Sequence, residues 1–235
     1  MAALLLTLPL AGCGNDGSAR AADLRPGSGS PATTLRLGYF ANVTHAPALV
    51  GVGKGLIAKD LGSTKLETQV FNAGPAAIEA LNAGAIDATY IGPNPAINAF
   101  VKSNGAAVRI VSGATSGGAQ LVVRAGIRSA ADLKGKNLAS PQLGGTQDVA
   151  LRAWLTEQGL KNSPSGGGDV TITPTENAQT LKLFQDGRLD GAWLPEPWAS
   201  RLVLDAGAKV LVDERSLWPG GRFLTTHLVV STRFL

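Results

Sequence analysis

The sequence predicts an α/β protein with two lobes of similar construction. From Leu35 onward, short runs rich in Val, Ile, Leu, Thr and Tyr alternate with stretches whose apolar residues recur at helical spacing, as in parallel β-α-β units. One segment also recurs, because residues 84–91 (GAIDATYI) resemble residues 187–194 (GRLDGAWL). Residues 105–111 and 207–212 form a second matching pair in the same order. Two such matches indicate two similar lobes, with a ligand site beyond the carboxyl ends of their strands.

The first half of the folded part holds alternating strands and helices. In chain order we expect strand 35–39, helix 47–59, strand 66–71, helix 75–82, strand 88–91, helix 95–103, and strands 108–112 and 120–124. The strands contain neighbouring or alternating apolar and β-branched residues. Each helix carries a proline in its first turn, where proline is favoured: Pro47, Pro75 and Pro95.

The second half repeats this plan. In chain order we expect strand 137–140, helix 146–158, strand 170–174, helix 177–185, strand 191–194, helix 197–206, and strands 209–212 and 228–231. Residues 170–174 alternate Val and Ile with Thr, and Pro197 suits the start of its helix. Thr146 is expected to cap the helix that follows it.

Composition and charge narrow the classes of function. The chain has 44% hydrophobic and 16% charged residues, which is typical of a globular core. Its net charge of +4 comes from scattered Lys and Arg, with no basic run and little aromatic interleaving, so we expect no nucleic-acid partner. The single cysteine excludes an internal disulfide, and His45 and His227 lack metal-ligand spacing. We expect neither a metal nor a cofactor.

The N-terminus resembles a lipoprotein leader. Residues 1–10 are apolar but too short to span a bilayer, and they run into Leu-Ala-Gly-Cys at 10–13. We therefore expect a signal peptide at 1–13, lipidation of Cys13 and a flexible Gly-, Ser- and Pro-containing tether at 14–34. No Lys or Arg precedes the apolar run, and an incidental cysteine near a frayed terminus is the alternative.

The predicted ligand site lies where strands end and helices begin. Free backbone N–H groups and the positive end of the helix dipole hold an anion there without a bound cation. The expected ligand-binding residues are Tyr39, Asn42, Thr44, His45, Asn94, Ser116, Gly117, Gly145, Thr146, Trp193 and Glu196. Thr146 is the first candidate, since Gly144 and Gly145 allow close backbone approach. The alternative is that these are ordinary turn and cap residues, and Glu196 in particular suits a helix start.

Several motifs together resemble a known family. They are the leader ending at Cys13, LRLGYF at 35–40, Gly84-x-Ile86-Asp87, Gly92-x-Asn94-Pro95, Ser116-Gly117-Gly118, Gly145-Thr146-x-Asp148 and Trp193-x-Pro195-Glu196-Pro197-Trp198. In order and spacing they are similar to the sulfonate, nitrate and taurine group of periplasmic binding proteins. The resemblance implies the type II two-lobed fold. It also implies an extracytoplasmic, lipid-anchored monomer that carries an aliphatic sulfonate to an ABC permease and its ATPase subunits.

The resemblance leaves other ligands and roles open. Nitrate, bicarbonate, taurine and thiamine-pyrimidine binders share the same skeleton. Some relatives are enzymes, and His45 with Glu196 could act as an acid and base. A sensing module detached from a regulator is a third alternative, although no DNA-binding helix pair precedes Leu35.

The resemblance also implies domain boundaries. It places a first lobe at 35–124 and 227–235 and a second lobe at 125–226, with crossings near 124–130 and near His227. Family members usually continue for about another helical region after the strand at 228–231. We therefore expect a C-terminally truncated version of the fold, in which the first lobe is incomplete.

Overall fold

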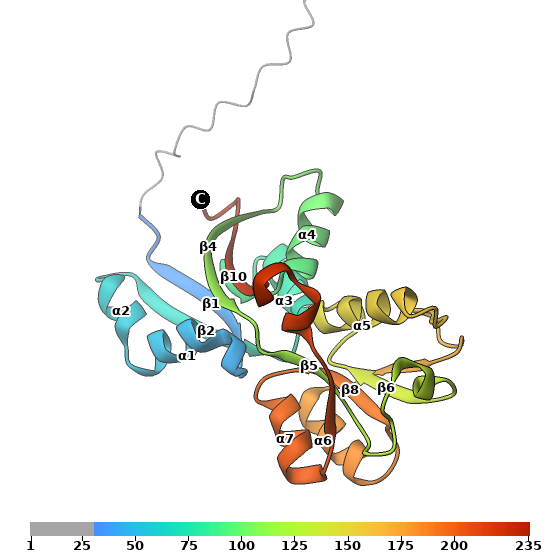
Figure 1. Ribbon diagram of the computed structural model, residues 1–235. Coiled ribbons are helices and arrows are strands. Elements are labelled where there is room, and N and C mark those ends of the chain that lie inside the picture. The colour runs from blue at the N-terminus through green and yellow to red at the C-terminus, as the bar shows by residue number, and fades with distance from the viewer. Residues whose placement is uncertain (1–30) are drawn as a thin grey trace, which may run out of the picture.

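The computed structural model describes residues 31–235, which form two α/β lobes lying end to end (Figure 1). The predicted signal peptide at 1–13, the lipidation site Cys13 and most of the tether at 14–34 lie outside the described residues. Within residues 31–235, no helix has the length and apolar character needed to cross a membrane.

The first lobe is built on a five-stranded sheet in the order β2-β1-β3-β10-β4. Its strands are β1 (Thr34–Phe40), β2 (Lys65–Phe71), β3 (Ala88–Ile91), β4 (Val108–Ser116) and β10 (Leu224–Ser231). Its helices are the short 3-10 helix η1 (Val43–His45), α1 (Ala46–Gly53), α2 (Leu56–Asp60), α3 (Gly74–Asn82) and α4 (Pro93–Lys102). β1 runs parallel to both neighbours, whereas β10 is antiparallel to β3 and β4. A core that includes Leu81, Ile91 and Val229 joins α3 and α4 to the sheet.

The second lobe has the sheet order β7-β6-β8-β5-β9. Its strands are β5 (Ala119–Val123), β6 (Asn137–Ser140), β7 (Thr171–Pro174), β8 (Gly191–Pro195) and β9 (Lys209–Asp213). Its helices are η2 (Ala130–Leu133), α5 (Thr146–Glu157), α6 (Asn177–Gln185), α7 (Trp198–Ala206), η3 (Glu214–Leu217) and η4 (Pro219–Gly221). Leu151 and Leu155 of α5 pack on one sheet face, and α6 and α7 cover the other with Phe184 and Leu202.

The repeated segment has the same structural role in both lobes. The carboxylate of Asp87 accepts the backbone N–H of Arg36 at 2.8 Å, and that of Asp190 accepts the backbone N–H of Asn137 at 2.9 Å. In each lobe, the aspartate thus joins the first residues of one strand, β1 or β6, to the turn that precedes a second strand, β3 or β8. The internal match therefore reflects two lobes built alike, as predicted.

The predicted strands all occur, and one predicted helix is divided. The expected helix 47–59 is two helices, α1 and α2, because Gly55 between them adopts a positive φ of 67°. β4 is longer than the expected 108–112, and β10 begins before the expected 228. The additional residues of both strands lie next to the segments that link the two lobes.

The crossings between the lobes differ from the expected ones. β5 pairs with β8 and β9, so it belongs to the second lobe, although the sequence assigned residues 120–124 to the first. The chain crosses at Gly117 and Gly118, whose φ values of 80° and 83° allow the turn. It returns before β10 begins at Leu224, not near His227. The expected boundaries at 124–130 and His227 are thus corrected.

Trp193, an expected ligand-binding residue, belongs instead to the core of the second lobe. Its side chain is fully buried, packs near Trp154 and donates its indole N–H to Glu214 at 2.8 Å. Because β8 is a central strand covered on both faces, a side chain here meets helices and not the cleft. Burial, with a contribution from Asp213, raises the pKa of Glu214 to about 7.

We expect the free energy of unfolding to fall as the pH rises from about 4.5 to about 7. The unfolded chain loses the Glu214 proton at a lower pH than the folded protein, so ionisation favours unfolding. This loss of stability is absent below the pKa of Glu214 in the unfolded chain and complete above its pKa in the folded protein. It amounts to at most about 3 kcal/mol. Glu214→Gln, which still accepts from Trp193, should flatten this profile in urea titrations at acidic and alkaline pH. The exposed Glu157→Gln is the control, and an unchanged slope in Glu214→Gln would refute this explanation.

Candidate functional site

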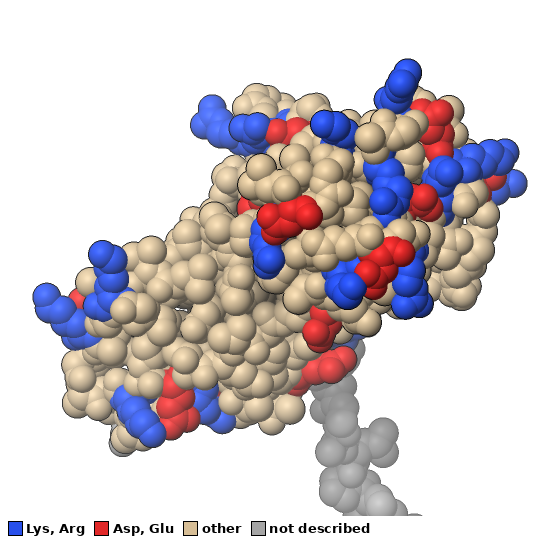
Figure 2. All heavy atoms as spheres, turned by 90° about the horizontal axis from the view of Figure 1, so that it is seen from below, with Lys and Arg blue, Asp and Glu red and all other residues tan. Residues whose placement is uncertain are grey.

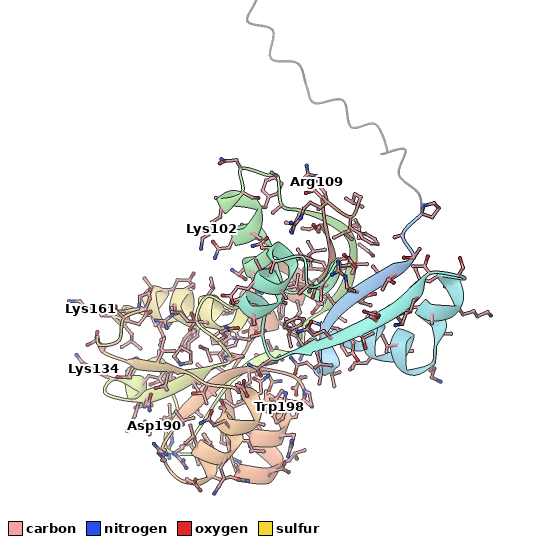
Figure 3. All side chains as sticks on the ribbon, turned by 180° about the vertical axis from the view of Figure 1, so that it is seen from behind. Lys102, Arg109, Lys134, Lys161, Asp190 and Trp198 are labelled. Atoms are coloured by element: carbon pink, nitrogen blue, oxygen red, sulfur yellow. The ribbon has the colours of Figure 1, made fainter. Side chains whose placement is uncertain are left out.

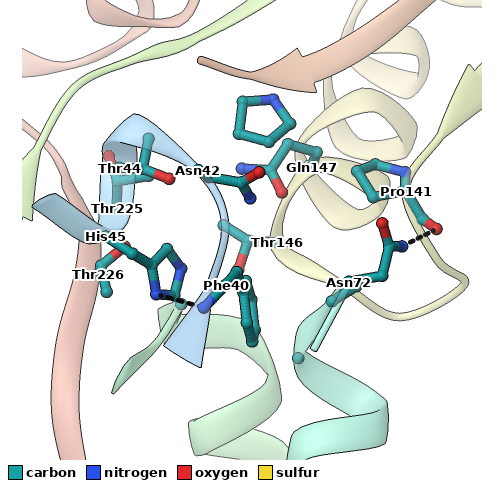
Figure 4. A pocket seen from close by; sticks show the side chains of 15 residues that line it. Phe40, Asn42, Thr44, His45, Asn72, Pro141, Thr146, Gln147, Thr225 and Thr226 are labelled. Carbon is teal, nitrogen blue, oxygen red and sulfur yellow. Dashed lines mark hydrogen bonds between the residues drawn. The ribbon is translucent and has the colours of Figure 1, made fainter. Parts of the chain in front are cut away.

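A small cavity lies between the lobes and is lined by both (Figure 4). The first lobe contributes Phe40, Asn42, Thr44, His45, Asn72, Ala73, Gly74, Gly92, Thr225 and Thr226, and the second contributes Pro141, Gly145, Thr146, Gln147 and Pro195. Its volume is about 20 Å³. A single water needs roughly 10–15 Å³ on this measure, so the closed cavity suits a compact group of few atoms.

No residue with a permanently charged side chain lines the cavity. Figure 3 places Arg109 on the outer part of the first lobe and Lys134 and Lys161 on that of the second. Lys102 lines a separate groove, which α3 and α4 share with Leu143 and Gly144. On the face shown in Figure 2, Lys and Arg are interspersed with Asp and Glu. Within residues 31–235, no cluster of His, Cys, Asp and Glu could hold a metal ion. Any ligand selectivity must therefore come from neutral donors and acceptors.

Four helix starts face the cavity, and three of them supply such donors. The residues that precede α1, α3, α4 and α5 are His45, Ala73, Gly92 and Gly145, and each lines the cavity without capping its helix through a side-chain hydrogen bond. In α1, which continues from η1, the N–H of Ala46 already donates to the carbonyl of Val43. The first N–H groups of a helix have no partner within it, and the helix dipole makes this end positive. Prolines occupy the first turns of α1, α3 and α4 but not of α5. The start of α5 thus offers the fullest set of backbone donors.

Thr146 adds a hydroxyl to this helix start. The expectation that Thr146 caps the helix is wrong: Gly145 is the N-cap, and Thr146 is the first helical residue. Its side chain is buried at 8% exposure, and its Oγ1 has no hydrogen-bond partner among the described residues. The Oγ1 of Thr226, across the cavity, is also buried without a partner. Unpartnered buried hydroxyls are costly, which points to a polar ligand as their partner.

Asp148 holds this turn in place. Its carboxylate accepts the Ser140 hydroxyl at 2.7 Å and the backbone N–H of Gly144 at 3.0 Å. Arg152, one helical turn later, donates to the same carboxylate at 2.9 Å, so the negative charge near the cavity is paired. The donors at the start of α5 are therefore rigidly placed before any ligand arrives.

His45 is a neutral donor in this site. Its Nδ1 accepts the backbone N–H of Phe40 at 3.3 Å, which assigns the ring proton to Nε2. Burial lowers the pKa of His45 to about 3. The ring is 2% exposed and stacks near Phe40. His45 can therefore donate a hydrogen bond to an anion but does not offer it a full positive charge at neutral pH.

The structure brings five expected ligand-binding residues together at the cavity, namely Asn42, Thr44, His45, Gly145 and Thr146. Tyr39, Asn94, Ser116, Gly117, Trp193 and Glu196 do not line it. Tyr39 and Phe40 alternate along β1, so only Phe40 points to the cavity. Asn94 is the second residue of α4, and the residue of this segment that lines the cavity is Gly92, two positions earlier.

The other three expected residues have structural partners. Ser116 ends β4, where it pairs with Leu224. Gly117 begins the crossing, where its N–H donates to the carbonyl of Phe223 at 3.1 Å and its carbonyl accepts the Thr225 hydroxyl. The carboxylate of Glu196 accepts the backbone N–H of Ser200 at 3.1 Å and its hydroxyl at 3.0 Å. The helix-start interpretation of Glu196 is therefore correct.

Sequence reasoning missed other parts of the wall. Asn72, Ala73 and Gly74 follow the carboxyl end of β2, so the rule that found the other turns would also have indicated these residues. Thr225 and Thr226 lie in the part of β10 that precedes the expected start at 228, and no pattern marks them.

The two lobes, the paired crossings and the interlobe cavity define the fold of a type II periplasmic binding protein. The alkanesulfonate-binding protein SsuA from Xanthomonas axonopodis pv. citri bound to MOPS superposes with a TM-score of 0.73 at 28% identity, over 88% of this chain and 68% of that chain. The periplasmic aliphatic sulphonate binding protein SsuA from Escherichia coli gives a TM-score of 0.67 at 27% identity, over 87% and 67% of the two chains. The predicted fold class is confirmed.

The chain belongs to the NMT1-like family, whose model matches residues 28–235. Among curated relatives, the nitrate/nitrite binding protein NrtA of Nostoc sp. is 26% identical over 191 residues, which are 73% of this chain and 42% of that protein. The chain spans about half the length of the curated relatives it matches. The predicted resemblance to the sulfonate and nitrate group is thereby confirmed.

Proposed function

We propose that the chain is the extracytoplasmic solute-binding component of an ABC importer and that its cavity binds a small oxyanion, with an aliphatic sulfonate as the first candidate. The observation that carries the proposal is the buried, unpartnered hydroxyl of Thr146 at the uncapped start of α5. An oxyanion oxygen there would accept from this hydroxyl and from the first backbone N–H groups of the helix.

The absence of charge in the lining favours an anion over a cation. A cation would need a carboxylate or several convergent oxygens, and the lining contains neither Asp nor Glu. Backbone N–H groups and the positive ends of helix dipoles favour negative charge, and they do so more strongly when water is excluded. The apolar side chains of Phe40 from the first lobe and of Pro141 and Pro195 from the second also line the cavity, and they suit a short alkyl substituent.

Nitrate is the second candidate, and the cavity volume of about 20 Å³ favours it because a bare anion needs less room than an alkylated one. The name of the Nostoc relative refers to nitrate and nitrite. Bicarbonate, taurine and a thiamine-pyrimidine precursor remain alternatives for the same donors.

In the proposed role, the protein binds and carries its solute without converting it. An acid and base pair of His45 and Glu196 is disfavoured, since burial lowers the pKa of His45 to about 3 and the Glu196 carboxylate bonds to Ser200 outside the cavity. As partners we propose an ABC permease with its ATPase subunits. We also propose a lipid on Cys13 as the membrane anchor of a monomeric protein.

Calorimetric titration of the protein against ethanesulfonate, taurine, nitrate, bicarbonate and sulfate tests this proposal. We expect tight one-to-one binding of ethanesulfonate and no product after prolonged incubation. A preference for nitrate or bicarbonate would keep the carrier role and change the solute. A folded protein that binds none of these anions, or one that converts its ligand, would overturn the proposal.

We expect the affinity for ethanesulfonate to change less than about twofold between pH 5.5 and pH 8. Burial lowers the pKa of His45 to about 3, well below this range, so the ring stays neutral throughout. A site that relied on protonated His45 would bind more tightly as the pH falls. Glu214→Gln is the control, since Glu214 titrates in this range without lining the cavity. A steep gain in affinity towards low pH that survives in this variant would contradict the assignment of His45 as a neutral donor.

A further inference from the structure

The side chain of Asn72 joins the lobes across the cleft. Its Nδ2 donates to the carbonyl of Pro141 at 3.3 Å, and its Oδ1 accepts the backbone N–H of Asn177 at 3.4 Å. Asn72 follows β2 in the first lobe, whereas Pro141 follows β6 and Asn177 begins α6 in the second. Figure 4 shows the first of these bonds at the edge of the cavity. Both the Nδ2 and the Oδ1 of the Asn72 side chain therefore form hydrogen bonds to the second lobe.

The bonds of Asn72 lie far from the segments about which the lobes would rotate. β2 is the edge strand of the first sheet on the side away from β4 and β10, the strands that adjoin the crossings. β6 and β7 lie at the corresponding far edge of the second sheet, away from β5 and β9. Asn72 therefore joins the lobes at the edges of the two sheets that lie farthest, in strand order, from the strands next to the crossings. When lobes rotate about their crossings, groups at this distance separate first and furthest.

The other hydrogen bonds between the lobes lie nearer to the crossings. The N–H of Val43 donates to the carbonyl of Glu196 at 2.9 Å, and the indole N–H of Trp198 donates to Asn42 at 3.0 Å. Glu196 is itself bonded to Gly118 in the crossing, because its N–H donates to that carbonyl at 2.9 Å. A small opening rotation would strain these bonds less than those of Asn72.

Resting on the proposed function, we infer that Asn72 is a latch: a positioning residue that holds the lobes closed at the edge remote from the crossings and sets the residence time of the bound solute. Both ends of the Asn72 amide are bonded to the second lobe. Asn72 therefore affects the ligand by keeping the lobes closed, and not by binding the ligand itself. Opening must break both of its bonds, which reach backbone groups of the second lobe.

The test compares Asn72→Ala and Asn72→Ser with the wild-type protein. Both variants remove the bonds to Pro141 and Asn177, and we expect the dissociation rate of ethanesulfonate in stopped-flow displacement to rise about tenfold, since each bond contributes modestly. The association rate should change little. Asn98→Ala, at an exposed position on α4, is the matched control.

Small-angle scattering of the protein without solute supplies a second readout. We expect the Asn72 variants to have a larger radius of gyration than the wild type and Asn98→Ala. Dissociation rates within twofold of the wild type, with unchanged scattering, would overturn the latch. If the wild-type protein binds no anion at all, the proposed function fails, and scattering alone then decides the latch: equal profiles refute it, and more open variants support it.

Discussion

Replacing Gly92 with alanine is expected to weaken solute binding about 100-fold by holding the lobes apart. Gly92 of the first lobe faces Thr146 of the second, and a Cβ atom at Gly92 would overlap the Thr146 Oγ1 and lie 3.1 Å from the Thr146 Cβ. The carbonyl of Thr225 would be 3.2 Å away on the other side. The φ of −76° and ψ of 165° at Gly92 suit any residue, so the obstacle is contact across the cleft and not backbone strain.

Calorimetry with ethanesulfonate measures this effect. Overpacking costs up to about 3 kcal/mol, which corresponds to about 100-fold in affinity when the cost falls on the closed state alone. Gly53→Ala is the control, because a Cβ at Gly53 in α1 meets nothing within 4 Å. Stability in the absence of solute should fall little in either variant, since the open lobes can avoid the contact. Wild-type affinity in Gly92→Ala would show that binding does not need this closed arrangement.

Replacing Thr146 with valine is expected to weaken ethanesulfonate binding by between about 10- and 100-fold. Valine keeps the shape of threonine but removes the hydroxyl, and a hydrogen bond to a charged group contributes about 1.5–3 kcal/mol. The ligand-free protein should not lose stability, because the Oγ1 of Thr146 has no partner among the described residues. Lower affinity at unchanged stability is the signature of a group reserved for the ligand.

Thr146→Ser separates the hydroxyl from the methyl group. Serine keeps the donor at the start of α5, so its affinity should stay within about threefold of the wild type. Titration calorimetry and thermal unfolding of both variants check the pair of expectations. Equal losses in the serine and valine variants would mean that packing of the methyl group, and not the hydroxyl, accounts for the contribution of Thr146.

Much of the fold could be predicted because it is recorded locally in the sequence. The alternation of apolar runs and helical stretches marked every strand. The repeated Gly-x-x-Asp segments marked two lobes, and within each lobe an aspartate, Asp87 or Asp190, joins two strands in the same way. The crossings were misplaced because strand patterns do not reveal which sheet a strand joins. The register of β5 with β8 and β9 depends on contacts far away in sequence.

Site residues could be predicted from the sequence where they directly follow the end of a strand. Asn42, Thr44, His45, Gly145 and Thr146 follow the carboxyl ends of β1 and β6, and all line the cavity. The failures have a different origin. The orientation of Trp193 depends on the buried carboxylate of Glu214, which binds its indole from a segment late in the chain. The role of Asn72 depends on the closed arrangement of the lobes, which no local pattern records.

The most direct test of the central claim is nuclear magnetic resonance of the ¹⁵N-labelled protein titrated with ethanesulfonate. The account predicts the largest amide shifts at the helix starts that line the cavity, above all Thr146, Gln147 and Gly74. Shifts should be small on the outer faces of α2 and α7. Shifts concentrated on those outer faces, or no shifts in a folded protein, would contradict the claim that uncapped helix starts between the two lobes bind a small oxyanion.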